Sequence, residues 1–270
     1  MSDTSIKIMY LNPVGESPEV DQIFADMARD HKLPGTEVHV VALPREHYGF
    51  SHIEFRTYEA LVTRGIMRAV RTATEEGFDA LAIGCFYDTA LHEAREISGA
   101  MIVTAPCNAS CEIAASLSNR FGIIVGRRKW VNQMKANVVE YGHGERLAGF
   151  YDVGLGVDDF QKDHQETNRR LLAAGREAVE EGGAESLILG CTMEIGFYRE
   201  IERELGVPVI DPSIAALKRA EYAAILKRQC GWVPSRKGSC EAPSEEEMAR
   251  FNAFAANDPV FGSRIVVEAA

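Results

Sequence analysis

The amino-acid sequence predicts an α/β fold built from two similar halves, each with a mainly parallel sheet. The first observation is a repeat: residues 79–85 (Asp-Ala-Leu-Ala-Ile-Gly-Cys) and 185–191 (Glu-Ser-Leu-Ile-Leu-Gly-Cys) are both short apolar runs that end in Gly-Cys. The second is that the same offset of 106 residues relates Pro106 to Pro212 without a gap. The third is the alternation of short apolar runs with longer amphipathic segments, which is typical of parallel strands covered by helices.

The first half begins with a strand signal that Asn12-Pro13-Val14-Gly15 ends. Ser17-Pro18-Glu19 predicts a helix start, because serine caps the first turn and proline is tolerated within it. Gly77 predicts a helix end, since glycine readily adopts the left-handed conformation found there. We expect strands at 6–11, 37–43, 80–83 and 101–104, helices at 17–28, 58–76 and 91–97, and an aromatic, polar loop at 44–52.

The second half repeats this order. Gly182-Gly183 closes its longest helix, as Gly77 does in the first half. Ser244 and the three glutamates after it predict a short helix in a less regular tail, because acidic residues favour the positive end of a helix dipole. We expect strands at 121–125, 148–153, 187–189 and 207–210, and helices at 129–141, 163–181, 197–205 and 213–229.

Composition narrows the functional class. The chain has 270 residues, of which 46% are hydrophobic and 26% charged, as in ordinary globular proteins. Its formal net charge of -11 argues against binding to nucleic acid or to an anionic membrane, which both need a basic surface. No apolar run approaches the ~18 residues that span a bilayer, and the first residues lack a signal-peptide pattern. We therefore expect a cytoplasmic protein whose partner is a small molecule.

Six cysteines are then expected to stay reduced. Cys107 and Cys111 are four residues apart, but no histidine or second cysteine pair is near enough in sequence to complete a zinc site. We interpret both as core thiols, and we interpret Cys230 and Cys240 in the same way. No metal site is expected.

Cys85 and Cys191 differ from these, because each follows a predicted strand and precedes a predicted helix. Unpaired backbone N–H groups and the positive helix end favour a thiolate at such a position. The preceding glycine allows a sharp turn and close approach of a substrate. Ligands of parallel α/β sheets bind at the carboxyl ends of the strands, so we expect both cysteines, with Asn12 and Gly126, at one cleft.

Two thiols that face each other suit the inversion of a carbon acid. One removes a proton from one face of the carbon, and the other returns a proton to the opposite face. The enolate-like intermediate needs hydrogen-bond donors. We expect these from the backbone after each cysteine, the Asn12 amide and the hydroxyls of Ser17 and Thr192.

Asp88 and Glu194 each lie three residues after one of these cysteines, in what we expect to be the first turn of the next helix. They complement the helix dipole or cap the helix, or they tune the thiols, since a nearby carboxylate raises the pKa of a thiol. Arg127 and Arg128 either begin a solvated helix or bind a carboxylate substrate.

Three motifs resemble the aspartate/glutamate racemase superfamily, and within it the hydantoin racemase branch: Asn12-Pro13, Gly84-Cys85-Phe86-Tyr87-Asp88 and Leu189-Gly190-Cys191-Thr192-Met193. The resemblance covers about residues 5–225. It implies two pseudo-symmetric Rossmann-like lobes with the active-site cleft between them, at 1–106 plus 212–270 and at 107–211. It also implies a homo-oligomer and a reaction without a cofactor.

On this interpretation Cys85 and Cys191 are the catalytic acid and base, and Asp88 and Glu194 are possible tuning groups. The residues expected to contact the substrate are Asn12, Ser17, Phe86, Tyr87, Thr192 and Met193.

Three functions stay open at this point. The first is racemisation of a 5-substituted hydantoin or a similar cyclic amide. The second is an isomerase, lyase or decarboxylase of a small carboxylic acid, of the maleate isomerase or arylmalonate decarboxylase type, in which one thiol can add to the substrate. Arginine side chains in the cleft would favour that version. The third is a small-ligand binding protein on the same fold.

Overall fold

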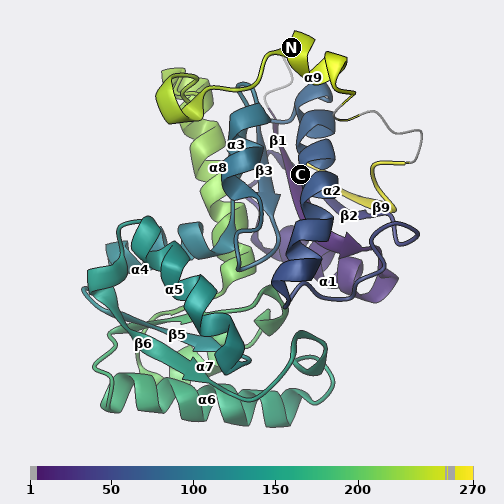
Figure 1. Cartoon of the computed structure of the whole chain (residues 1–270). Coiled ribbons are helices and arrows are strands. Elements are labelled where there is room, and N and C mark those ends of the chain that lie inside the picture. The colour runs from purple at the N-terminus through teal and green to yellow at the C-terminus, as the bar shows by residue number, and fades with distance from the viewer. Residues whose placement is uncertain (1–4, 253, 255–258, 270) are drawn as a thin grey trace. The chain divides into compact units, whose positions relative to one another are not determined.

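The chain folds into two α/β units (Figure 1). The computed structural model describes residues 5–252, 254 and 259–269. Unit 1 comprises Met1–Gly84, Thr89–Thr104 and Leu217–Ala270, and unit 2 comprises Cys85–Asp88 and Ala105–Ala216. The predicted lobes differ from these units at the junctions, because they place residues 85–88, 105–106 and 212–216 in the first lobe.

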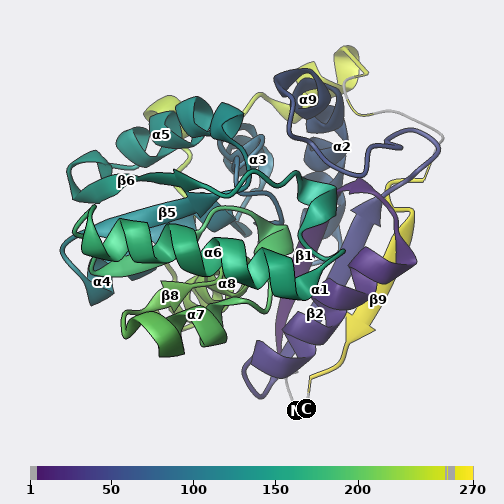
Figure 2. The same cartoon turned by 90° about the horizontal axis from the view of Figure 1, so that it is seen from below.

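Unit 1 contains a five-stranded sheet in the order β4-β3-β1-β2-β9. Its first four strands are parallel, and β9 pairs antiparallel with β2 at the edge. α1 contacts β2 and β9, whereas α2 contacts β1 and β3. Figure 2 shows α1 lying across β2 and β9. The strands are β1 (Ile6–Gly15), β2 (Thr36–Leu43), β3 (Ala80–Ile83), β4 (Ile102–Thr104) and β9 (Ser263–Val267); the helices are α1 (Pro18–His31), α2 (Arg56–Glu75), α3 (Leu91–Ile97) and α9 (Glu245–Arg250).

Unit 2 contains a four-stranded parallel sheet in the order β6-β5-β7-β8. Helix α6 contacts β5, β6 and β7, while α4 contacts β7 and β8. Figure 1 shows α4 and α5 on the face of this sheet opposite α6. The strands are β5 (Phe121–Val125), β6 (Leu147–Asp152), β7 (Ser186–Leu189) and β8 (Val209–Ile210); the helices are α4 (Pro106–Leu117), α5 (Val131–Glu140), α6 (His164–Glu180) and α7 (Tyr198–Leu205). Helix α8 (Pro212–Cys230) begins in unit 2 and continues into unit 1.

The two sheets repeat one topology, as the sequence predicts. Reading β1 to β4 as the counterparts of β5 to β8, the orders 4-3-1-2 and 8-7-5-6 are the same. β3 and β7 are related by the 106-residue offset at both ends. Gly77 and Gly183, at the same offset, both have positive φ, of 75° and 67°. The mainly parallel α/β fold with pseudo-symmetric halves is therefore confirmed.

Most predicted elements lie within a few residues of the observed ones, but one strand end was wrong and two elements were not predicted. β1 does not end at residue 11: it continues to Gly15, with an irregularity in its pairing to β2 after Asn12. The sequence reading missed α4, whose start at Pro106 is a favourable first-turn position for proline. It also missed β9, because that edge strand is formed by pairing with a segment more than 200 residues away in the chain.

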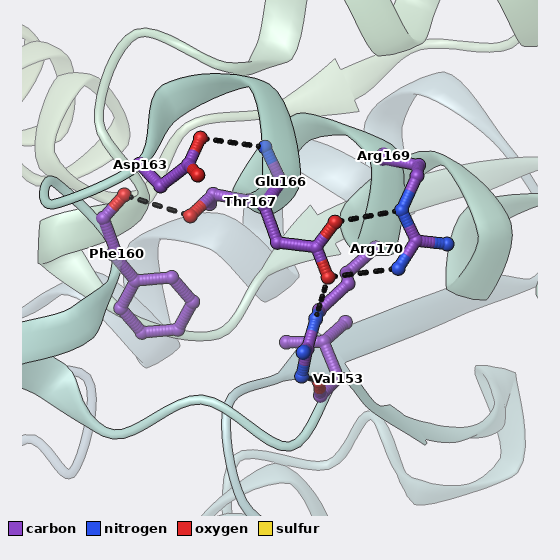
Figure 3. A network of polar contacts seen from close by, with 7 residues as sticks. All are labelled: Val153, Phe160, Asp163, Glu166, Thr167, Arg169 and Arg170. Carbon is purple, nitrogen blue, oxygen red and sulfur yellow. Dashed lines mark hydrogen bonds and ion pairs between the residues drawn. The ribbon is translucent and has the colours of Figure 1, made fainter.

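Polar contacts secure the start of α6 in unit 2 (Figure 3). The Asp163 carboxylate caps the helix by accepting the Glu166 N–H at 3.0 Å. Arg170 bonds to Glu166 and donates to the Val153 carbonyl at 3.0 Å, which ties the helix to the end of β6. Hydrogen bonds from Arg169 and Arg170 lower the pKa of Glu166 to about 2. The carboxylate thus stays charged and holds both arginines.

Among the described residues, no helix combines the length and the apolar composition of a bilayer-spanning segment.

Candidate functional site

Each Gly-Cys pair directly follows a strand, β3 or β7, and its glycine bonds to the neighbouring strand, β1 or β5. The Gly84 N–H donates to the Leu11 carbonyl of β1, at 2.7 Å. The Gly190 N–H donates to the Ile124 carbonyl of β5, also at 2.7 Å. The two halves therefore place their cysteines at equivalent carboxyl ends of parallel strands.

The glycines are required for close approach rather than for a left-handed turn. Neither Gly84 nor Gly190 has a positive φ. A Cβ on Gly84 would lie 2.9 Å from the Leu11 carbonyl oxygen, and one on Gly190 would lie 2.6 Å from that of Ile124. The expected sharp turn is thus not the reason for glycine here; the neighbouring strand leaves no room for a side chain.

The carbonyl of each cysteine accepts the same backbone hydrogen bond. The Cys85 carbonyl accepts the Asp88 N–H at 2.9 Å, and the Cys191 carbonyl accepts the Glu194 N–H at 3.0 Å. Cys191 lies in the apolar cluster of unit 2 and is 8% exposed, whereas Cys85 is half-buried and packs against that cluster. Both thiols therefore belong to unit 2, although β3, which precedes Cys85, belongs to unit 1.

The helices that follow the cysteines begin close to their predicted bounds, several residues after each cysteine. α3 begins at Leu91 and α7 at Tyr198, with only a short 3-10 turn, Thr192–Glu194, next to Cys191. Asp88 is therefore not in the first turn of a helix; it has a left-handed backbone with φ 52°. The expected contribution of a helix dipole to Cys85 was wrong, because helix-end effects fall off within one turn.

Asp88 instead caps α4 from a distance. Its two carboxylate oxygens accept the Cys107 and Asn108 N–H groups, each at 2.8 Å, and Tyr141 donates its hydroxyl at 2.9 Å. The Asn137 amide adds a bond to the Tyr87 carbonyl at 2.8 Å. These contacts hold the loop that carries Cys85 in unit 2.

Glu194 behaves differently from Asp88. Its side chain is fully buried and turns back to accept the Cys191 N–H at 3.2 Å. Burial raises the pKa of Glu194 well above its usual value; hydrogen bonds from the backbone of Cys191 and Gly190 oppose the rise, and the negative charge of Asp211 adds to it.

Asn12 lies in β1, where the pairing with β2 becomes irregular, and Ser17 directly precedes α1. A residue outside the predicted site holds both. Asp21 is buried, and it accepts the Asn12 amide at 3.2 Å and the Ser17 N–H at 3.2 Å. Ser263 in β9 donates its hydroxyl to the same carboxylate at 2.7 Å. In the sequence, Asp21 is recognisable only as an acidic residue in the first turn of a helix. Such residues commonly complement the helix dipole, so this position does not by itself indicate a site.

The other predicted substrate contacts are in unit 2. Phe86, Tyr87 and Thr192 are buried, and Met193 is partly buried. Thr192 is anchored by its carbonyl, which accepts the Ser213 hydroxyl at 3.3 Å. The structure brings these four residues together with both cysteines in one unit.

The remaining cysteines divide into two kinds. Cys107 and Cys111 are fully buried in α4, as expected, and a hydrogen bond to Cys111 together with burial raises the pKa of Cys107. Cys230 and Cys240 are exposed, so their assignment to a core was wrong. Cys230 is the last residue of α8, and Cys240 lies beyond that helix.

Arg127 and Arg128 follow β5 and line a hollow of about 380 Å³ in unit 2. The hollow also contains the carboxylates Asp152 and Asp159, and its described lining includes neither Cys85 nor Cys191. The arginines thus share this hollow with two acidic residues.

Comparison with known proteins gives one family. The Asp/Glu/Hydantoin racemase family model matches residues 14–220. A hydantoin racemase from Paenarthrobacter aurescens is 33% identical over 246 residues, which cover 90% of this chain and 99% of that protein. Among solved structures, an allantoin racemase from Klebsiella pneumoniae has a TM-score of 0.81 and 26% identity, over 89% of this chain and 95% of that one.

An arylmalonate decarboxylase has the same fold, with a TM-score of 0.57 and 20% identity over 81% of this chain and 92% of its own. That likeness extends to the fold alone, whereas the family model and the hydantoin racemase match most of the sequence. The chain belongs to the Asp/Glu/Hydantoin racemase family and is an isomerase of the racemase type.

Proposed function

We propose that this racemase inverts the stereocentre of a 5-substituted hydantoin or a closely related cyclic amide, with Cys85 and Cys191 as its two acid–base groups. The observation that carries the proposal is the equivalence of the two Gly-Cys turns, which have the same strand contact and the same backbone hydrogen bond. The names of the relatives support the substrate class, since allantoin is itself a hydantoin with a ureido substituent.

The reaction balances without a further reactant. One cysteine, as thiolate, takes the proton from the ring carbon that bears the substituent, and the electron pair moves into the adjacent carbonyl to form an enolate. The other cysteine, as thiol, returns a proton to the opposite face, and the electron pair moves back to carbon. The two sulfurs have then exchanged protonation states, so the enzyme is ready for the opposite enantiomer. No cofactor takes part in this scheme.

The remaining predicted contacts have defined chemical roles in the proposal. Asn12 and the hydroxyls of Ser17 and Thr192 donate hydrogen bonds to the oxygens of the ring, where negative charge develops. Asp21 would orient the Asn12 amide, because it accepts one of the two amide hydrogens. Phe86, Tyr87 and Met193 provide the apolar surface for the ring and its substituent.

A carboxylic-acid substrate has weaker support. It would need a cation close to the thiols, and the described lining of the Arg127 and Arg128 hollow includes two carboxylates and neither cysteine. The likeness to arylmalonate decarboxylase supports the fold and adds nothing about the reaction.

The test is proton exchange in D2O. Single enantiomers of 5-substituted hydantoins, allantoin, amino acids and arylmalonate- or maleate-type acids are incubated with wild type, Cys85→Ser and Cys191→Ser. We expect deuterium at the stereocentre of a hydantoin with loss of optical activity, abolished by either substitution. Cys230→Ser, which removes an exposed thiol, serves as the matched control and should keep full activity.

Two results would contradict the proposal. Deuterium in a decarboxylated or isomerised acid, with one substitution far more damaging than the other, would move the protein to the carboxylic-acid reactions. Full racemase activity in either cysteine variant would remove that cysteine from the mechanism.

A further inference from the structure

The two copies of the 106-residue repeat place their acidic residues differently, and this difference isolates one carboxyl group. At the start of α4, the Cys107 and Asn108 N–H groups bind Asp88. At the start of α8, the equivalent N–H groups of Ser213 and Ile214 bind Asp211, at 2.9 and 3.3 Å.

Asp211 is the reason for the difference. It stands 106 residues after Ala105, which has no polar side chain with which to cap α4. Because Asp211 caps α8 locally, Glu194, the counterpart of Asp88, is not needed there. Its carboxyl group turns to Cys191 instead.

Glu194 has the surroundings of a neutral acid. It is fully buried, and within the described part of the chain its Oε1 has no hydrogen-bond partner. The charged group that faces it from another element is Asp211, which is also negative. The Asp211 carboxylate accepts three backbone N–H groups, those of Gly196, Ser213 and Ile214.

We propose that Glu194 is a positioning residue that remains protonated while the enzyme works: it anchors the backbone of Cys191 without placing a negative charge beside the thiol. This inference deepens the proposed function and rests on it for the role of Cys191. A charged Glu194 would oppose formation of the Cys191 thiolate, because like charges in a buried site repel strongly. A neutral carboxyl keeps the hydrogen bond and removes the repulsion.

The experiment compares Glu194→Gln with Glu194→Ala. Glutamine is neutral at every pH and its carbonyl still accepts the Cys191 N–H; alanine removes the acceptor. We expect Ala to lower kcat/KM by about tenfold or more and Gln to restore it to within about threefold of wild type. Glu200→Ala, an exposed acid of α7, is the control for a surface change and should have no effect.

The pH profile separates positioning from simple stabilisation. We expect wild type and Glu194→Gln to share the acidic limb of kcat/KM against pH, because both are neutral at this position there. At high pH, wild type should lose activity as Glu194 ionises, and the Gln variant should keep it. An acidic limb that moves down by about one pH unit in the Gln variant would show that Glu194 is charged in the working enzyme, and would overturn the proposal.

A second readout needs no substrate. The rate at which iodoacetamide modifies Cys191 is followed against pH by peptide mass spectrometry, and its midpoint should agree between wild type and Glu194→Gln. If it agrees but no hydantoin is racemised, the proposed function fails and the inference about Glu194 stands. If racemisation depends on both cysteines but the midpoint shifts in the Gln variant, or the Ala variant is fully active, the inference fails alone.

Discussion

Asp88 and Glu194 show how much one residue position can differ between two copies of a repeat. Both follow a Gly-Cys pair by three residues and both donate their N–H to the cysteine carbonyl. The backbone role is local, and it survives in both halves. The role of the side chain depends on the N–H groups that are available to it. Asp88 binds N–H groups at the start of α4, whereas the equivalent groups of α8 are already bound by Asp211 and leave none for Glu194. Asp88 and Glu194 occupy the same position of the repeat, so their different roles are not visible in the sequence.

The buried proton of Glu194 predicts a pH dependence of stability. Below its ordinary pKa of 4.5, folded and unfolded chains both hold the proton. Above that value the unfolded chain ionises while the folded chain keeps the proton, so wild-type stability falls by about 1.4 kcal/mol per pH unit until the raised pKa is reached. Glu194→Gln has no such loss. We expect the stability of the Gln variant relative to wild type to rise as the pH increases above 4.5, until the raised pKa of Glu194 is reached.

Urea denaturation at several pH values measures this difference. The exposed Glu200→Gln is the matched control and should give a difference that does not change with pH. A constant difference for Glu194→Gln as well would mean that the folded protein binds no extra proton at residue 194.

The elements of unit 2 explain why a loop that follows β3 belongs with α4. Residues 85–88 are held there by hydrogen bonds from the start of α4 to Asp88 and from α5 to Tyr87. The sequence predicted β3 and α3 with their observed bounds, since both have clear apolar patterns. It did not predict α4, so the partner of Asp88 was unknown and the carboxylate was placed in the wrong helix.

Asp88 caps α4 from a distant position in the chain, and Asp163 caps α6 locally, so we expect their removal to have different effects. Asp88→Ala leaves the start of α4 without an acceptor and frees the Cys85 loop, so we expect a loss of about 1–3 kcal/mol in unfolding free energy together with a reduced kcat. Asp163→Ala removes a local cap at the exposed start of α6, where a loss of about 1 kcal/mol and unchanged kcat are expected.

Thermal melting and racemase kinetics of the two variants check this prediction. Equal kcat values for Asp88→Ala and wild type would indicate that the Cys85 loop keeps its position without the carboxylate.

On the scale of the whole molecule, the chain returns to unit 1 after completing unit 2. The last part of α8 is fastened there by Glu221, which accepts the Leu33 N–H at 2.6 Å, and by Arg228, which pairs with Asp79. β9 then completes the sheet beside β2. Two charged side chains of α8, Glu221 and Arg228, therefore explain why the end of this helix belongs to unit 1. No comparable pattern in the sequence indicates β9.

The homo-oligomer expected from the resemblance stays a prediction at this scale. Light scattering coupled to size-exclusion chromatography should give a mass of at least twice the chain mass of 29.7 kDa. The chain mass itself, found over a range of protein concentrations, would contradict it.

The sequence by itself determined the parallel α/β fold, the internal repeat, the two Gly-Cys pairs and the resemblance to the racemases. These depend on local patterns: apolar runs, helix-ending glycines and a constant offset, all readable along the chain. Only the tertiary structure decided that Asp21 holds Asn12 and Ser17, that Asp88 caps α4 and that Glu194 is a buried acid beside Cys191. A carboxyl group's partner and charge depend on which distant donors and charges surround it, and folding alone brings those together.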